Sequence, residues 1–112
     1  MNKNRVVNLF VSNLANVIVH KVLEIAIDRP EIASVYTKEV KNSLQIAKNY
    51  REKINPLDKV LPIEYARDIR DRIITKVKAE LNSRIRKGYT NISISLVETF
   101  VDASLKELGI IM

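Results

Sequence analysis

Residues 4–27, NRVVNLFVSNLANVIVHKVLEIAI, form the longest apolar stretch of the chain and decide its fold. The stretch is too long for one strand and contains no turn residue, so we predict a helix. On a helical wheel, one side collects eight apolar side chains: Val6, Val7, Phe10, Leu14, Val17, Ile18, Val22 and Ile25. Four more lie on the other side: Leu9, Val19, Leu23 and Ile27. A helix that is apolar around most of its circumference is normally buried. We therefore expect it at the centre of the fold, where a second copy of the chain can be among its partners.

Glycine and proline, the residues that break helices, are scarce. The 112 residues include two glycines and three prolines, whereas average usage would give about thirteen. All-β sandwiches and barrels need a turn about every 8–12 residues, which five such residues cannot supply. A chain of this length fits one domain. We therefore predict a single all-helical domain over residues 1–112.

The remaining helices follow from apolar spacing and from the positions of the breakers. Pro30 fits the first position of a second helix, with Asp28 or Arg29 as its cap. Two prolines bracket a linker over residues 55–62, and Lys87-Gly88 is a typical helix end. Four helices result, over about 4–27, 30–53, 62–87 and 95–108. This pattern predicts an up-and-down four-helix bundle or a closely related all-α domain.

Two helix ends carry more specific signals. Ser95 followed by Glu98 fits the capping-box pattern at the start of the fourth helix. Leu108-Gly109 fits a glycine stop at its end. Apolar stripes are predicted on the later helices as well, and they include Ile32, Ile63 and Ile85.

The N-terminal segment raises the question of a signal peptide or a membrane span. Asparagine and serine interrupt its apolar run, and no small-residue cleavage site follows it. Lys21 and Glu24 arrive before 18 apolar residues have accumulated. We therefore expect a cytoplasmic protein with no membrane partner.

The residue inventory argues against an enzyme. The absence of cysteine excludes disulfides, cysteine-ligated metals and thiol catalysis. His20 is the only histidine and lies at the polar edge of the first helix, so we expect a surface or satisfied structural role. Glu64, Asp68 and Asp71 share a helix face, but basic neighbours favour ion pairs, Asp68 with Arg72 and Asp71 with Arg67, over a metal site. Phosphate-binding and nucleophile motifs are absent as well. We predict no catalytic residue, no metal, no cofactor and no small-molecule substrate.

Charge is distributed unevenly along the chain. The formal net charge of +6 divides into +1 over residues 1–37, +7 over 38–87 and −2 over 88–112. A basic region can bind nucleic acid or another polyanion, although a solvated basic face is the simpler interpretation. The candidate phosphate-binding residues are Lys41, Lys48, Arg72, Lys76, Arg86 and Lys87. A helix-turn-helix is not expected, because Glu98, Asp102 and Glu107 would repel a phosphate backbone.

Three charged residues lie in apolar surroundings and are candidates for an interface: Lys21, Glu24 and Arg70. Arg70 falls in the middle of the apolar sector of the third helix. Its stem can pack while its head reaches water, or it can form a buried or interface ion pair, with Glu24 or Glu98 as partner. Polar residues within apolar stripes often set pairing and register. We therefore expect a homo-oligomer, formed through the first helix or the Arg70 face.

These observations predict a non-enzymatic protein-interaction or scaffold module that forms a homo-oligomer. The alternative is a nucleic-acid-binding protein that uses the basic second and third helices. An enzyme subunit whose chemistry resides in another chain is a third hypothesis.

Overall fold

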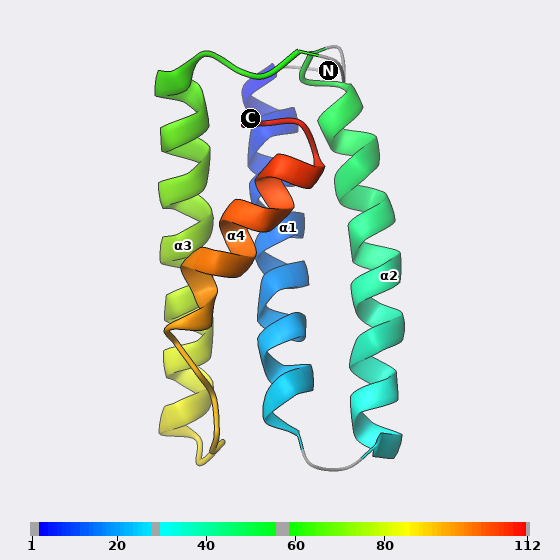
Figure 1. The fold of residues 1–112 in the computed structure, drawn as a ribbon, viewed down its shortest axis with the longest axis vertical. Coiled ribbons are helices and arrows are strands. Elements are labelled where there is room, and N and C mark those ends of the chain that lie inside the picture. The colour runs from blue at the N-terminus through cyan, green and yellow to red at the C-terminus, as the bar shows by residue number, and fades with distance from the viewer. Residues whose placement is uncertain (1–2, 28–29, 56–58, 112) are drawn as a thin grey trace.

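The computed structural model describes residues 3–27, 30–55 and 59–111, and the chain folds into four helices (Figure 1). Helix α1 spans Lys3–Ala26, α2 Pro30–Glu52, α3 Ile63–Arg86 and α4 Leu96–Glu107. The predicted all-α fold is confirmed, and every predicted helix is present. Pro30 is the first residue of α2 as expected, whereas its predicted caps, Asp28 and Arg29, lie outside the described residues.

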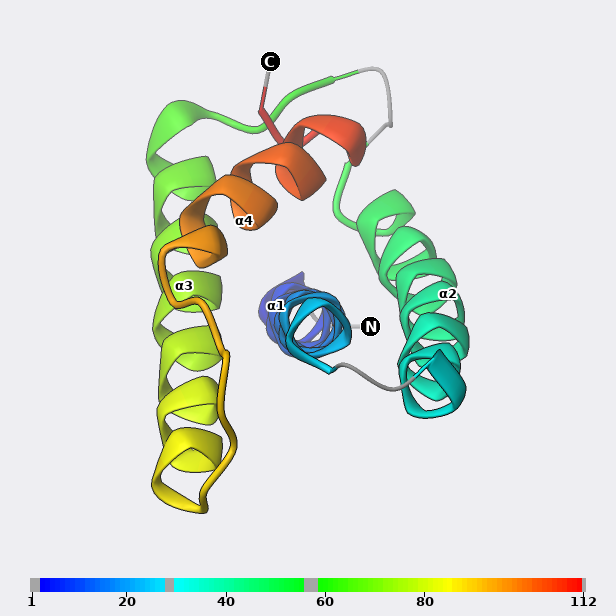
Figure 2. The same ribbon diagram turned by 60° about the horizontal axis from the view of Figure 1, so that its bottom comes forward.

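Helix α1 lies at the centre of the fold, as the apolar sequence predicts. It packs against each of the other three helices, whereas α2 packs against no other helix within the described residues. Viewed down its axis, α1 is flanked by α2 and α3, and α4 covers a third side (Figure 2). Six α1 side chains are wholly buried: Phe10, Val11, Leu14, Val17, Ile18 and Leu23.

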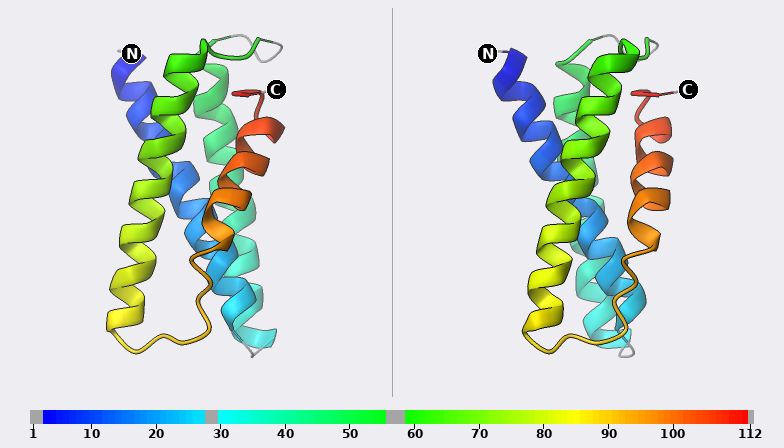
Figure 3. Two further views of the ribbon diagram at one scale, coloured as in Figure 1. Left: turned by 60° about the vertical axis from the view of Figure 1, so that its left-hand side comes forward. Right: turned by 90° about the vertical axis from the view of Figure 1, so that its left-hand side faces the viewer.

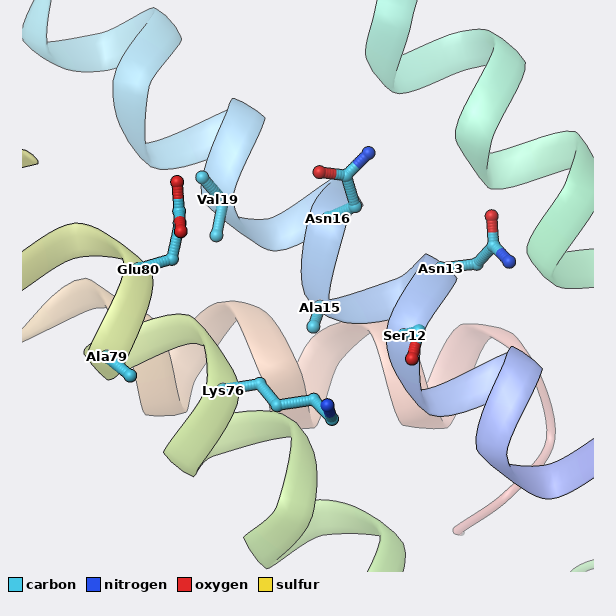
Figure 4. A pocket seen from close by; sticks show the side chains of 8 residues that line it. All are labelled: Ser12, Asn13, Ala15, Asn16, Val19, Lys76, Ala79 and Glu80. Atoms are coloured by element: carbon cyan, nitrogen blue, oxygen red, sulfur yellow. The ribbon is translucent and has the colours of Figure 1, made fainter. Parts of the chain in front are cut away.

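The fourth side of α1 differs from a regular four-helix bundle. Helix α4 is shorter than the others and crosses α1 obliquely (Figures 1 and 3). Ser12 and Asn16 are exposed on the side of α1 turned away from α4 (Figure 4), and the helical period places the exposed Asn8 on the same side, so this side is polar. The domain is therefore three long helices covered on one face by a short fourth.

Both predicted glycine stops are present and close the helices in the same way. Gly88 and Gly109 have positive φ angles of 100° and 70°, which glycine adopts without steric cost. After α4, the Ile110 N–H donates to the Leu105 carbonyl at 2.9 Å and the Gly109 N–H donates to the Lys106 carbonyl at 3.1 Å. These two bonds define a Schellman motif. Leu105 and Ile110 are both fully buried, so the motif turns the chain end back into the core.

The predicted capping box at the start of α4 is wrong. Ser95 has helical backbone angles, and its side chain makes no capping hydrogen bond. Its hydroxyl instead lies 2.9 Å from the Ser93 hydroxyl, and the Leu96 and Val97 N–H groups donate to carbonyls of the preceding turn. Because that turn already satisfies the first amides, a side-chain cap is not needed.

Four isoleucines predicted in apolar stripes are exposed: Ile25, Ile32, Ile63 and Ile85. Each lies in the first three or last two residues of its helix. These terminal positions are exposed although the apolar period continues through them. The stripe therefore predicts the buried side of each helix but not the length over which it is covered.

The side chain of Arg51 in α2 is fully buried, and all five of its N–H groups donate hydrogen bonds. Nε donates to the Leu108 carbonyl at 2.7 Å. Nη1 donates to the carbonyl of Asn55 at 3.2 Å and to its Oδ1. Nη2 donates to the carbonyls of Lys59 and Gly109, each at 2.9 Å. One side chain therefore joins the end of α2, the approach to α3 and the end of α4.

None of the five acceptors is a carboxylate, so carbonyl dipoles offset the buried charge of Arg51. The carbonyl ends of α2 and α4 carry partial negative charge, which favours a cation there. Burial lowers the pKa of Arg51, but a guanidinium stays protonated at neutral pH. The Leu61 N–H adds a further link by donating to the Ile110 carbonyl at 3.2 Å.

Replacing Arg51 should destabilise the domain strongly. Arg51→Met keeps the apolar stem but leaves several buried carbonyls without donors, so we expect a loss of about 3 kcal/mol in the free energy of unfolding. Chemical denaturation measures this loss. Lys48→Met, which removes an exposed cation from the same helix, should change it by less than about 0.5 kcal/mol. Equal stability of the two variants would contradict the role of Arg51.

Candidate interaction surfaces

Arg70 makes an ion pair within the chain. Its Nε donates to Asp102 Oδ1 at 2.7 Å and its Nη2 donates to Oδ2 at 3.2 Å, which joins α3 to α4. These bonds and the negative charge of Asp102 raise the pKa of Arg70. The side chain is 33% exposed, so its stem packs while its head stays at the surface. Its partner is neither Glu24 nor Glu98, the two that the sequence suggested.

The other two predicted interface residues lie on α1, and one of them links α1 to α2. Glu24 accepts a hydrogen bond from Thr37 Oγ1 at 2.8 Å, which links the two helices. Lys21 is half-buried and forms no ion pair with any residue in the described ranges. Glu24 and Arg70 are thus already engaged within one chain, and their part in an oligomer stays a prediction.

The acidic residues of α3 form ion pairs with neighbouring arginines. Asp68 lies 3.7 Å from Arg72, as predicted. Asp71 lies 3.8 Å from Arg70 rather than pairing with Arg67. Within the described part of the chain, no three histidine or acidic side chains are grouped as metal ligands.

Arg72 and Lys76 lie together, because both line a hollow of about 300 Å³ on α3, whereas the other predicted phosphate-binding residues lie elsewhere on the surface. Lys76 lines a hollow of about 650 Å³ between α1 and α3 (Figure 4). Lys48 lines a separate hollow of about 310 Å³ beside the end of α4. Lys41 follows the helical period to the same flank of α2 as Lys48, and Arg86 and Lys87 are exposed at the end of α3.

The hollow between α1 and α3 is lined mainly by polar groups. Ser12 and Asn16 are exposed on its α1 wall, and Lys76 and Glu80 extend from α3 (Figure 4). Asn13 is turned toward its own helix, because its Nδ2 donates to the Leu9 carbonyl at 3.0 Å. Hydroxyl, amide and ammonium groups therefore stand side by side at this face.

Another hollow, of about 520 Å³, lies where α1 begins and α2 ends. Its apolar walls include Val7, Leu61 and Ile69, and Arg72 stands at it. Arg72 already donates to Asn8 Oδ1 and pairs with Asp68. Asp68 and Arg72, the two charged side chains among the described residues that line this hollow, are therefore paired with each other.

The outer flank of α2 exposes three aliphatic side chains: Ile32 at 40%, Val35 at 53% and Ile46 at 44%. At 100° per residue they fall within about 60° of one another on the helix. Sequence periodicity predicts Ile32 in the inner stripe of α2 and predicts neither a buried nor an exposed role for Val35 and Ile46. The sequence does contain a sign of this exposed row. Val35 and Ile46 are aliphatic residues that fall outside the inner apolar stripe, among polar positions of the helix.

The side chain of His20 is largely buried rather than lying at the surface. Its side chain is 12% exposed, with Nε2 3.4 Å from Glu39 Oε2 and the ring centroid 5.5 Å from that of Tyr36. Nδ1 is buried without a hydrogen-bond partner in the described residues. Burial lowers the pKa of His20, and the Arg84 charge acts in the same direction, whereas Glu39 and Glu80 oppose it.

Among the residues that the structure describes, one helix has the length and apolar composition of a membrane span. It is Asn4–Ala26, and 56% of its most apolar window is buried inside the domain. The core helix of a soluble protein and a signal sequence share this property, so the composition of α1 alone is weak evidence for a membrane span.

Comparison with known proteins finds no matching family, no matching curated protein and no matching solved structure. Functional inference therefore depends on the surfaces of this chain alone.

Acidification should destabilise the domain through His20. Because burial lowers its pKa in the folded state, the unfolded chain binds the proton more readily. The free energy of unfolding should be highest above the usual histidine pKa of 6.5 and should decrease as the pH drops below it. His20 is the only histidine, so thermal unfolding at pH 7.5 and 5.5 tests it directly. A His20→Gln variant should show a smaller difference in unfolding temperature between the two pH values. An unchanged difference would contradict the role of His20 in this pH dependence.

Proposed function

We propose that this domain is a non-enzymatic protein-interaction module that self-associates through the outer flank of α2. The observation that supports this is the exposed aliphatic row of Ile32, Val35 and Ile46. Helix α2 packs on α1 alone among the described helices, so no other helix covers its outer flank. The exposed side chains of α1 opposite α4 are polar instead, which makes α1 the weaker candidate for an apolar contact.

The size of the row predicts a weak complex. Complete burial of one aliphatic side chain contributes about 1.5–3 kcal/mol, and these three are already half covered within the chain. Three such side chains per copy make a small interface of the transient class. We therefore expect reversible association, with a dissociation constant on the order of micromolar.

A charge introduced into the row should prevent association. Val35→Glu places a carboxylate among the aliphatic side chains, which would have to be desolvated on binding. Sedimentation equilibrium should show at least a tenfold increase in the dissociation constant. Ser34→Glu adds the same charge at an exposed neighbouring position on another side of the helix and should have little effect. A wild-type chain that stays monomeric up to about 1 mM would refute self-association.

Nucleic-acid binding is the second candidate function, and the hollow between α1 and α3 supports it. Lys76 stands beside the exposed Ser12 and Asn16, and these groups can all contact phosphates. The candidate lysines on α2, Lys41 and Lys48, lie on another part of the surface. They therefore do not extend the hollow into one continuous basic surface.

Binding at this hollow should be weakest at high salt. Single-stranded and duplex probes should be retained at low ionic strength, and Lys76→Glu should weaken the binding and reduce its salt dependence by about one phosphate contact. Lys48→Glu, beside the end of α4, is the matched charge reversal and should leave binding nearly unchanged. If no probe is retained at low salt, this candidate function is excluded.

A further inference from the structure

The outer flank of α2 contains a heptad pattern. Residues 32, 39 and 46 recur every seven positions, and residues 35, 42 and 49 form the second series. In coiled coils, two such series form the seam that faces a partner helix. All six side chains are exposed: Ile32, Val35, Glu39, Asn42, Ile46 and Asn49. The inner face of α2, with Tyr36, Val40 and Ala47, packs on α1. Helix α2 therefore has one seam turned inward and a second along its exposed flank, where Glu39 also reaches His20 of α1.

We propose that α2 of a second copy of this chain docks antiparallel on the outer seam, around a two-fold axis. This inference rests on the proposed self-association and names its geometry. In an antiparallel pair, a residue of one series faces a residue of the other series in the partner. Val35 of one copy then faces Ile46 of the other. In the next layers, Ile32 faces Asn49 and Glu39 faces Asn42. Every contact occurs twice, as two-fold symmetry requires.

Charge and hydrogen bonding favour the antiparallel arrangement over a parallel one. In a parallel pair, Glu39 would lie against Glu39 of the other copy. Like charges that face each other in this way are destabilising. In the antiparallel pair, the amide of Asn42 can donate to the Glu39 carboxylate, which also lies 3.4 Å from His20 Nε2. A polar layer between apolar ones fixes the register of paired helices.

The opposite flank of α2 is unsuited to a second copy. It carries Lys41 and Lys48, which share one side of the helix at a spacing of seven residues. A two-fold axis on that flank would bring the lysines of both copies together. The positions of the aliphatic side chains and of the lysines on α2 thus favour the same seam for docking.

Disulfide cross-linking tests this register directly, because the chain has no cysteine of its own. Val35→Cys and Ile46→Cys are made as separate variants at exposed positions, and circular dichroism verifies that each is folded. A disulfide requires Cα atoms about 4.4–6.8 Å apart. Residues 35 and 46 are about 16 Å apart along one helix. Oxidation of the mixed variants should therefore give a covalent dimer, whereas each variant alone should stay largely uncrosslinked.

The controls separate this inference from the proposed function. Ser34→Cys mixed with Ile46→Cys should give no covalent dimer, because Ser34 lies off the seam. Efficient cross-linking of Val35→Cys with itself would show a parallel pair and overturn the antiparallel register. A dimer in sedimentation without cross-linking in the mixture would overturn the seam but leave self-association intact. A monomer in sedimentation would overturn both.

Discussion

The buried guanidinium of Arg51 is the interaction on which the arrangement of these helices depends most. Its five N–H groups bind carbonyl and amide oxygens at the ends of α2 and α4 and in the approach to α3. Its partners among the described residues are all neutral, and a buried cation of this kind is stable only when each donor finds an acceptor. Helix ends supply such acceptors, because their last carbonyls have no partner within the helix. Arg51 thus closes one end of the domain by satisfying groups that helix ends leave open.

This closure also determines which surfaces remain available. Helix α2 is held by its inner face on α1 and by Arg51 near its end, and no helix in the described ranges covers its outer flank. The aliphatic side chains of that flank are exposed in one copy, and the heptad spacing suits them to a second. Helix α4 covers one side of α1, so the polar row of Asn8, Ser12 and Asn16 remains at the surface on another.

The helices could be predicted from the sequence because local signals determine them. Apolar periodicity marks each helix, while Pro30, Gly88 and Gly109 mark three of their boundaries. The central position of α1 also followed, since a helix apolar on most sides must be surrounded. The failed capping box at Ser95 shows the limit of a local motif, because the preceding turn satisfied the same amides.

The long-range contacts could not be predicted in the same way. Arg51 lies four residues after the buried Ala47, so periodicity alone places it on the inner face of α2. Four of its five acceptors, however, are backbone carbonyls, up to 58 residues away, and every residue type has such a carbonyl. Asp102 was one of several acids that Arg70 could reach, and only the crossing of α3 and α4 selects it. The basic residues likewise share a region of the sequence without sharing one surface, because α1 lies between α2 and α3 (Figure 2).

The hydrogen-bonded state of the Arg51 guanidinium is the most direct test of this account. Nuclear magnetic resonance of the arginine side-chain N–H groups measures their exchange with water. The account predicts slow exchange of the Arg51 protons and restricted rotation of the guanidinium, whereas exposed Arg86 exchanges rapidly. If the Arg51 protons exchange as fast as those of Arg86, the guanidinium is in water, and the account of how α2, α3 and α4 are joined is wrong.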